Sequence, residues 1–218
     1  MVLTPRLRRR HRRRFTEHPH HPNHEETSMS TVTVIGTGNM GQAIAGLVTK
    51  GGNTAEVIAH ADTDKAVTGD IVVLAVPHAA VAEIISARKD QLAGKVVVDI
   101  TNPLDFATFS LTVPADSSAA AQIAEALPDS KVVKAFNTNF GPTLAAGTVG
   151  GQTTTVVLAG DDAEAKAALV AVVAAAGLKT VDAGPLARAR ELEALAYLQI
   201  GLAASEQIGW TGGFAVVS

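Results

Sequence analysis

The chain has 218 residues, enough for one globular domain with a small appendage. It contains no cysteine, which excludes disulfides, thiolate metal sites and thiol nucleophiles, and no apolar run reaches the roughly 18 residues that a membrane span requires. Seven of the 18 Lys and Arg and three of the 21 Asp and Glu lie in residues 1–29, so residues 30–218 carry 11 basic and 18 acidic side chains. This acidic body argues against nucleic acid as the main partner.

Residues 1–29 are a separate basic head. The arginines are not followed by a hydrophobic region, which excludes secretory and twin-arginine signals. We expect this segment to be disordered. Two explanations stay open: translation begins at Met29, or the head is an arm that binds a polyanion.

From Thr31 onward, β-branched and apolar runs alternate with segments of helical periodicity. In chain order the sequence predicts a strand at 31–35, a helix at 39–50, strands at 55–59 and 71–76, a helix at 78–88, a strand at 95–100, a helix at 117–127, strands at 131–136 and 153–160, a helix at 161–176, a strand at 178–184 and a helix at 185–206. Alternation of this kind is typical of a Rossmann-type, doubly wound, mainly parallel α/β sheet.

The link between the second and third strands is unusually short. About eleven residues separate them, whereas a parallel crossover normally needs a dozen or more. We therefore expect a shortened second crossover, with the chain passing directly from one side of the first strand to the other. Residues 30–150 then form the dinucleotide-binding Rossmann domain, and 151–218 form a small C-terminal strand–helix extension that completes the sheet and the site.

The strongest local motif is a glycine loop that follows the first strand and opens the first helix. Gly36 permits the tight turn, Gly38 lets the backbone approach a pyrophosphate, and Gly41 permits close helix–sheet packing. The free N–H groups of the following helix supply an anion site. The sequence therefore predicts a dinucleotide cofactor, against the alternative of a βαβ unit that merely keeps a tight turn.

Polar residues follow several other strands at their carboxyl ends, where ligands bind in such sheets. His78 follows one strand, Asp99 and Asn102 another, and Asn137 a third; each also has an ordinary explanation as a helix or turn residue. Lys134 lies inside an apolar strand, which is explained equally by snorkelling to a rim or by function.

These motifs occur in the order GTGNMG (36–41), LAVP (74–77), DITNPL (99–104), VVKAFNT (132–138) and VDAGPL (181–186). With them, the chain resembles the NADPH-dependent oxidoreductases that reduce the deazaflavin coenzyme F-420, from about Thr31 to the end of the last helix. The resemblance implies direct hydride transfer between nicotinamide C4 and the deazaflavin, with NADP as cofactor and the deazaflavin as co-substrate. We expect no catalytic acid or base and no metal, because proximity and orientation supply most of the rate enhancement when a hydride passes between two hydride carriers.

The residues that we expect to bind ligands follow from that resemblance. The pyrophosphate is expected at the glycine loop, formed by Gly36, Thr37, Gly38, Asn39, Met40 and Gly41. The nicotinamide half is expected at Ala75, Val76, Pro77 and His78, and the second ring at Asn102, Pro103, Asn137 and Thr138.

Cofactor preference depends on residues 59–65. Relatives in this family hold the 2′-phosphate with a loop threonine, a Ser-Arg pair and a lysine. Thr37 and Lys65 match, while His60-Ala61 replaces the Ser-Arg pair and removes the guanidinium fork. Asp62 could instead accept a hydrogen bond from a ribose 2′-hydroxyl, as in NAD-binding folds. NADP is the expected cofactor, and NAD is the alternative.

Two other functions remain open. One is an NAD(P)-dependent dehydrogenase or reductase of another small acceptor, and the other is a non-catalytic dinucleotide sensor. The apolar segment 192–217 suits a homodimer interface or core burial. We expect a cytoplasmic protein whose partner is a small-molecule redox acceptor.

Overall fold

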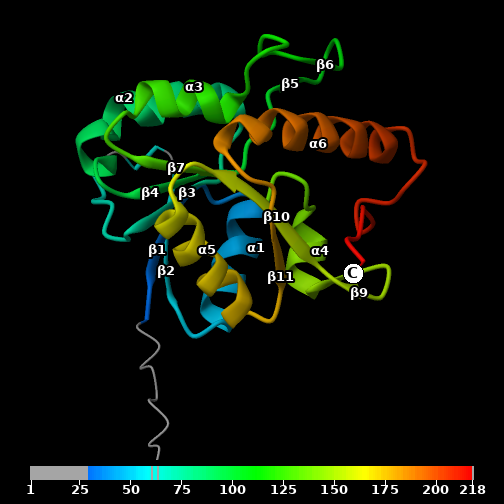
Figure 1. The fold of residues 1–218 in the computed structure, drawn as a ribbon, viewed down its shortest axis with the longest axis horizontal. Helices are drawn as coiled ribbons and strands as arrows, with labels where there is room; N and C mark the ends of the chain where they lie inside the picture. Colours follow the sequence, from blue (N-terminus) through cyan, green and yellow to red (C-terminus); the bar gives the residue numbers. More distant parts are fainter. Residues whose placement is uncertain (1–28, 60, 63, 218) are drawn as a thin grey trace, which may run out of the picture.

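The structure, a computed structural model, describes residues 29–59, 61–62 and 64–217. The expectations for residues 1–28 and for His60 lie outside this part of the chain. The main sheet contains β1 (Thr31–Ile35), β2 (Thr54–Ile58), β3 (Ile71–Leu74), β4 (Val96–Asp99), β7 (Lys131–Lys134), β10 (Thr155–Gly160) and β11 (Lys179–Asp182). Their order across the sheet is β11-β10-β7-β4-β3-β1-β2 (Figure 1).

Two short hairpins and six helices complete the described fold. The hairpins are β5 (Leu104–Asp105) with β6 (Ser110–Leu111), and β8 (Thr148–Val149) with β9 (Gln152–Thr153). The helices are α1 (Asn39–Lys50), α2 (Val81–Leu92), α3 (Ala119–Ala126), α4 (Gly141–Ala146), α5 (Ala163–Ala175) and α6 (Ala189–Ala204). Single 3₁₀ turns at His78–Ala80 and Leu186–Arg188 precede α2 and α6.

The sheet is covered by helices on both faces, which explains why its central strands are almost wholly apolar. Helices α1, α4 and α5 pack on one face, and α2, α3 and α6 pack on the other (Figure 1). Side chains alternate along each strand: in β3, Val73 joins the first core, whereas Val72 and Leu74 join the second. The predicted Rossmann-type α/β fold is therefore confirmed.

The shortened second crossover is also confirmed. Strands β2 and β3 pair in parallel with opposite edges of β1. Helix α2 holds the described part of the link, which contains no helix: Arg88 donates to the carbonyls of Asp62 and Lys65, and the Gln91 side-chain oxygen accepts from the Val67 amide at 2.9 Å. Since Arg88 is only 1% exposed, these carbonyls satisfy a guanidinium inside the protein.

The direction of β10 differs from the simple alternation of strands and helices. It pairs antiparallel with β7, while β11 runs parallel to β10. The reason lies in the intervening segment, where α4 and the β8–β9 hairpin replace a full crossover helix. Thr154, at the end of this hairpin, bonds back to the carbonyls of Thr143 and Gly147, so the chain enters β10 from the carboxyl end of β7.

No helix in the described residues is long and apolar enough to cross a membrane.

Candidate functional site

A cleft lies at the carboxyl ends of β1, β3, β4 and β7, and it has two adjoining compartments. The first, of about 700 Å³, is lined by residues 38–40, 75–79, 100–102 and 104–106 together with Thr112 and Ile200. The second, of about 360 Å³, is lined by residues 39–40, 137 and 139–142 with Trp210. The two share Asn39, Met40, Ile100, Asn102, Phe106 and Ile200, so they adjoin at these residues.

The glycine loop adopts the geometry that its motif predicts. Gly36 has φ +129°, and a Cβ there would lie 2.0 Å from the Ala75 carbonyl oxygen. A Cβ at Gly41 would lie 2.2 Å from the Gly36 carbonyl oxygen. Both positions therefore require glycine for the protein's own packing, as the close approach of α1 to the sheet demands.

Gly38 is different, because the fold does not require it. Its backbone is extended (φ −71°, ψ −179°), and a Cβ there would meet no atom within 4 Å. It lines the first compartment, so the missing side chain leaves room for a ligand beside the backbone. Within the described residues, no side chain caps α1 and its first turn holds no acid, which leaves the helix N-terminus available to an anion. These features fit a dinucleotide pyrophosphate.

The turn after β3 lies next to the glycine loop and also lines the first compartment. Ala75, Val76, Pro77 and His78, which we expect at the nicotinamide half, all line it. The His78 ring is half-buried, and its Nδ1 lies 3.5 Å from the Thr101 hydroxyl. The structure thus brings this turn, the glycine loop and Asn102 to one cavity.

Two asparagines join the ends of β4 and β7. The Asn137 amide nitrogen donates to Asn102 Oδ1 at 3.1 Å and to the Leu192 carbonyl at 3.0 Å, while the Asn102 amide donates to the Asn137 carbonyl at 3.1 Å. The Leu192 carbonyl can only accept, which fixes the orientation of the Asn137 amide. Its Oδ1 is left buried without a partner among the described residues, as is Asn139 Oδ1. Both residues line the second compartment.

The other two residues predicted at the second ring do not line the cleft. Pro103 is buried, and its carbonyl accepts from the Thr112 amide at 2.7 Å. The Thr138 carbonyl accepts from Gln199 at 3.2 Å. Both support the wall from behind, and neither compartment includes their side chains.

Lys134 does not snorkel to a rim. Its ammonium is fully buried and lies 2.8 Å from Asp99 Oδ2, 2.8 Å from Glu193 Oε1 and 2.6 Å from the Thr101 carbonyl oxygen. Glu193 also accepts from the amides of Ala119 and Ala120, at the start of α3. This ionic cluster joins β4, β7, α3 and α6 directly beneath the loop that carries Asn102.

The expected ribose side lies outside both compartments. The side chains of Thr37, Asp62 and Lys65 are exposed. Close to Lys65, the Glu56 carboxylate accepts from the hydroxyls of Thr68 and Thr33, and the Thr68 hydroxyl in particular lowers the pKa of Glu56 below its ordinary value.

Sequence reasoning missed the aromatic residues of the cleft. Phe106 and Phe140 lie just beyond the DITNPL and VVKAFNT motifs, and Trp210 is the single tryptophan of the chain, set among glycines. It also missed Arg88, whose spacing from Ile84 and Leu92 places it on the buried face of α2.

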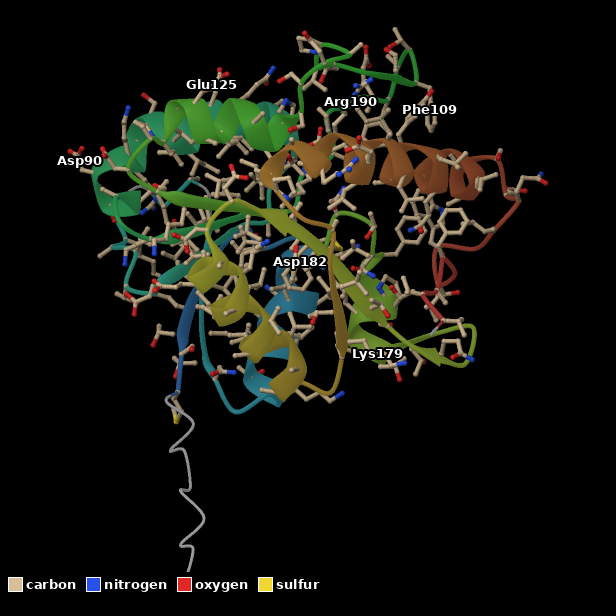
Figure 2. All side chains as sticks on the ribbon, viewed as in Figure 1. Asp90, Phe109, Glu125, Lys179, Asp182 and Arg190 are labelled. Atoms are coloured by element: carbon tan, nitrogen blue, oxygen red, sulfur yellow. The ribbon has the colours of Figure 1, made fainter. Side chains whose placement is uncertain are left out.

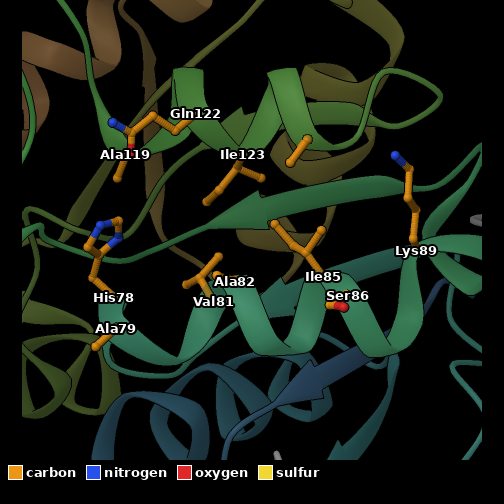
Figure 3. Close-up of a pocket in the computed structure, with 11 residues that line it drawn as sticks. His78, Ala79, Val81, Ala82, Ile85, Ser86, Lys89, Ala119, Gln122 and Ile123 are labelled. Atoms are coloured by element: carbon orange, nitrogen blue, oxygen red, sulfur yellow. The ribbon is translucent and has the colours of Figure 1, made fainter.

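A further cavity of about 540 Å³ lies between α2 and α3 (Figure 3). Alanines and branched apolar side chains dominate it, with His78 and Gln122 toward one end and Lys89 toward the other. The glycine loop is absent from its lining, so we do not assign the dinucleotide to it. Among the described residues, no group of three or more His, Asp or Glu could hold a metal ion.

The fold and the glycine-loop cleft define a Rossmann-type nucleotide-binding protein. A protein-family profile described as NADP oxidoreductase, coenzyme F420-dependent, matches residues 55–103. The F420-dependent NADP reductase of Methanocaldococcus jannaschii is 32% identical over 156 residues, which cover 69% of this chain and 70% of that protein. The chain belongs to this reductase family.

Two further proteins are similar to this chain. A solved structure of a proposed F420-dependent NADP reductase from Arthrobacter sp. FB24 superposes with a TM-score of 0.75 at 26% identity, covering 86% of this chain and 99% of that one. The metalloreductase STEAP3 of Rattus norvegicus is 40% identical over 106 residues, which are 49% of this chain but only 21% of that protein.

Proposed function

We propose that the protein transfers a hydride between NADP(H) and the deazaflavin coenzyme F420. The observation that carries this proposal is the pair of adjoining compartments. One lies against a glycine loop suited to a pyrophosphate, and the other is walled by aromatic and amide side chains. Two flat rings bound in these compartments would lie next to each other. The name of the 32% identical relative, F420-dependent NADP reductase, supports both ligands.

When bound, the nicotinamide donates or accepts a hydride at C4, and one solvent proton balances the two-electron reduction of the second ring. The protein's part is to bind and orient. The glycine loop and the start of α1 hold the pyrophosphate, and residues 75–78 hold the nicotinamide. Asn102 and Asn137, locked to each other, fix the wall where the second ring lies. We assign no general acid or base, since orientation of two reactants supplies the catalysis.

Cofactor preference is part of this proposal. Thr37, Lys65 and the His60 position favour the 2′-phosphate of NADP, and Asp62 favours the bare hydroxyl of NAD. The exposed side chain of Lys65 supports NADP as the main cofactor, whereas the carboxylate of the nearby Glu56 opposes a further negative charge there.

The direct test follows the bleaching of oxidised coenzyme F420 by the purified protein with NADPH and, in parallel, with NADH. We expect bleaching with NADPH preferred, and transfer of deuterium from C4-deuterated NADPH to the reduced deazaflavin. Absence of bleaching with both donors would refute the proposal that coenzyme F420 is the hydride acceptor. Flavin and ferric complexes tested alongside would then separate a reductase of another acceptor from a sensor, which binds dinucleotide without oxidising it.

We further propose a homodimer located in the cytoplasm, where NADP(H) is available. Exposed apolar side chains on α6 and the segment after it, among them Leu198, Phe214 and Val217, support a subunit interface. Light scattering after size exclusion measures the mass directly, and cell fractionation tests the location.

We also propose a functional boundary near residue 150. Residues 30–150 bind the dinucleotide, and 151–218 complete the sheet through β10 and β11 and the cleft through Ile200 and Trp210. A chain ending at residue 150 should then fail to reduce the acceptor.

A further inference from the structure

The segment after α6 turns back toward the cleft and presents one aromatic side chain. Helix α6 ends at Ala204, and a tight turn follows in which the Gly212 amide donates to the Gly209 carbonyl at 2.8 Å. Trp210 occupies the second position of this turn. A Cβ at Gly212 would lie 3.1 Å from the Gly209 oxygen, so glycine keeps the turn tight.

A buried glutamine ties this segment to the cleft wall. Gln199, which is 2% exposed, donates to the Thr138 carbonyl at 3.2 Å and accepts from the Phe214 amide at 3.2 Å. Gly213, which directly precedes Phe214, has φ +147°, and a Cβ there would lie 3.3 Å from Gln199 Oε1. The backbone can approach Gln199 so closely only because glycine occupies this position. The position of Trp210 is thus fixed from both sides.

Trp210 forms an aromatic wall of the second compartment. Its ring centroid lies 5.1 Å from that of Phe140, with the planes tilted by 54°. The indole nevertheless stays 52% exposed, and Phe106, which lines both compartments, is 72% exposed. Two large aromatic side chains therefore leave surface uncovered at the same cavity. Such exposure at a concave site indicates ligand binding.

The hairpin that carries Phe106 is itself anchored on α6. The Tyr197 hydroxyl donates to the Phe109 carbonyl at 2.8 Å, and the two rings lie 5.8 Å apart. Phe109 sits between the hairpin and α6 (Figure 2), where a Cβ at Gly201 would lie 3.2 Å from its ring. One helix thus positions both exposed aromatic residues, Phe106 through Tyr197 and Trp210 through Gln199.

We propose that Trp210 is the stacking residue of the acceptor compartment, so that residues 205–217 select a flat, fused-ring acceptor. The inference rests on the proposed function, which it deepens by naming the residue that recognises the acceptor. Trp210 lines the second compartment but not the first, so it acts on the acceptor and not on the dinucleotide. Stacking on indole suits a tricyclic deazaflavin, because aromatic pairs gain attraction beyond that of simple burial.

The test compares Trp210→Leu and Trp210→Phe with Phe214→Leu as the matched control. Phe214 is 48% exposed on the same segment and lines neither compartment. We expect Trp210→Leu to raise the KM for oxidised coenzyme F420 about tenfold, or ~1.4 kcal/mol, with the KM for NADPH unchanged. Trp210→Phe should restore most of the loss, and Phe214→Leu should resemble the wild type.

Two results would overturn the inference while leaving the proposed function intact. The first is an unchanged KM for the deazaflavin in Trp210→Leu. The second is an equal rise in both KM values together with a change in oligomeric mass, which would place Trp210 in a subunit interface. Absence of deazaflavin reduction by the wild type is a separate outcome, which refutes the proposed function and the inference with it.

Discussion

Replacement of Lys134 by methionine tests the buried ionic cluster. At 2.8 Å, each of its two ion pairs has a Coulomb attraction of about 6 kcal/mol at an effective dielectric constant near 20. Desolvation of the three ions offsets most of this attraction, so the intact cluster adds little net stability. Removal of the lysine is different, because Asp99 and Glu193 are then left buried and adjacent without a counter-ion. That change costs about 3–5 kcal/mol.

The assay is thermal and urea unfolding of Lys134→Met beside Lys131→Met. Lys131 lies three residues earlier on β7, with its side chain 39% exposed, and pairs with Asp162 at 3.2 Å. For a chain of this length, 3–5 kcal/mol corresponds to a fall in melting temperature of roughly 10 °C. The Lys131 variant should melt close to the wild type, since exposed ion pairs add little.

The reasoning is refuted if the two variants melt together. It also predicts coupling: Glu193→Gln added to Lys134→Met removes one of the two unpaired charges and should recover part of the lost stability. Strictly additive losses in the double variant would show that the lysine and the glutamate do not share one cluster.

Three further predictions concern the cofactor side. Gly38→Ala should leave the melting temperature unchanged and raise the KM for NADPH about tenfold (~1.4 kcal/mol). Gly41→Ala should unfold the chain, because its Cβ would lie 2.2 Å from a carbonyl oxygen. Equal melting temperatures of the two variants would contradict this prediction. Lys65→Ala should lower kcat/KM for NADPH about tenfold and leave that for NADH unchanged, and an equal loss with both would exclude a phosphate contact. The Thr68 hydroxyl holds the pKa of Glu56 below its ordinary 4.5. The ionised Glu56 therefore stabilises the folded protein above pH 4.5, and this stabilisation is lost as the pH falls through the lowered pKa. Glu56→Gln should remove it. Urea titrations of both chains from pH 7 to 3 measure it, and a difference that grows toward pH 3 would contradict the sign.

Most of the sheet was predictable because local pattern and tertiary burial agree. The β3 run of β-branched residues is buried on both faces, and Gly36 and Gly41 stand where only glycine fits. The antiparallel direction of β10 was not predictable, since it depends on how Thr154 bonds back to α4. Strand periodicity cannot report the direction of a strand.

In the candidate site, what could be predicted was the part that follows a strand directly. The glycine loop, residues 75–78 and the two asparagines fall at strand ends, where topology brings them together. Trp210 and Phe106 reach the cleft from segments whose position α6 determines, and a linear sequence does not show that contact. The burial of Lys134 likewise depends on Glu193, 59 residues further along the chain.

The hold of α2 on the shortened crossover limits how cofactor preference can be redesigned. Arg88 satisfies its guanidinium with two backbone carbonyls of that link. Grafting a foreign loop that places its carbonyls elsewhere would leave an arginine, 1% exposed, without acceptors, and a buried unpaired charge costs several kcal/mol. The crossover between β2 and β3 and helix α2 must therefore be replaced together. A graft between relatives should carry both segments together, with residue 88 chosen to suit the incoming backbone.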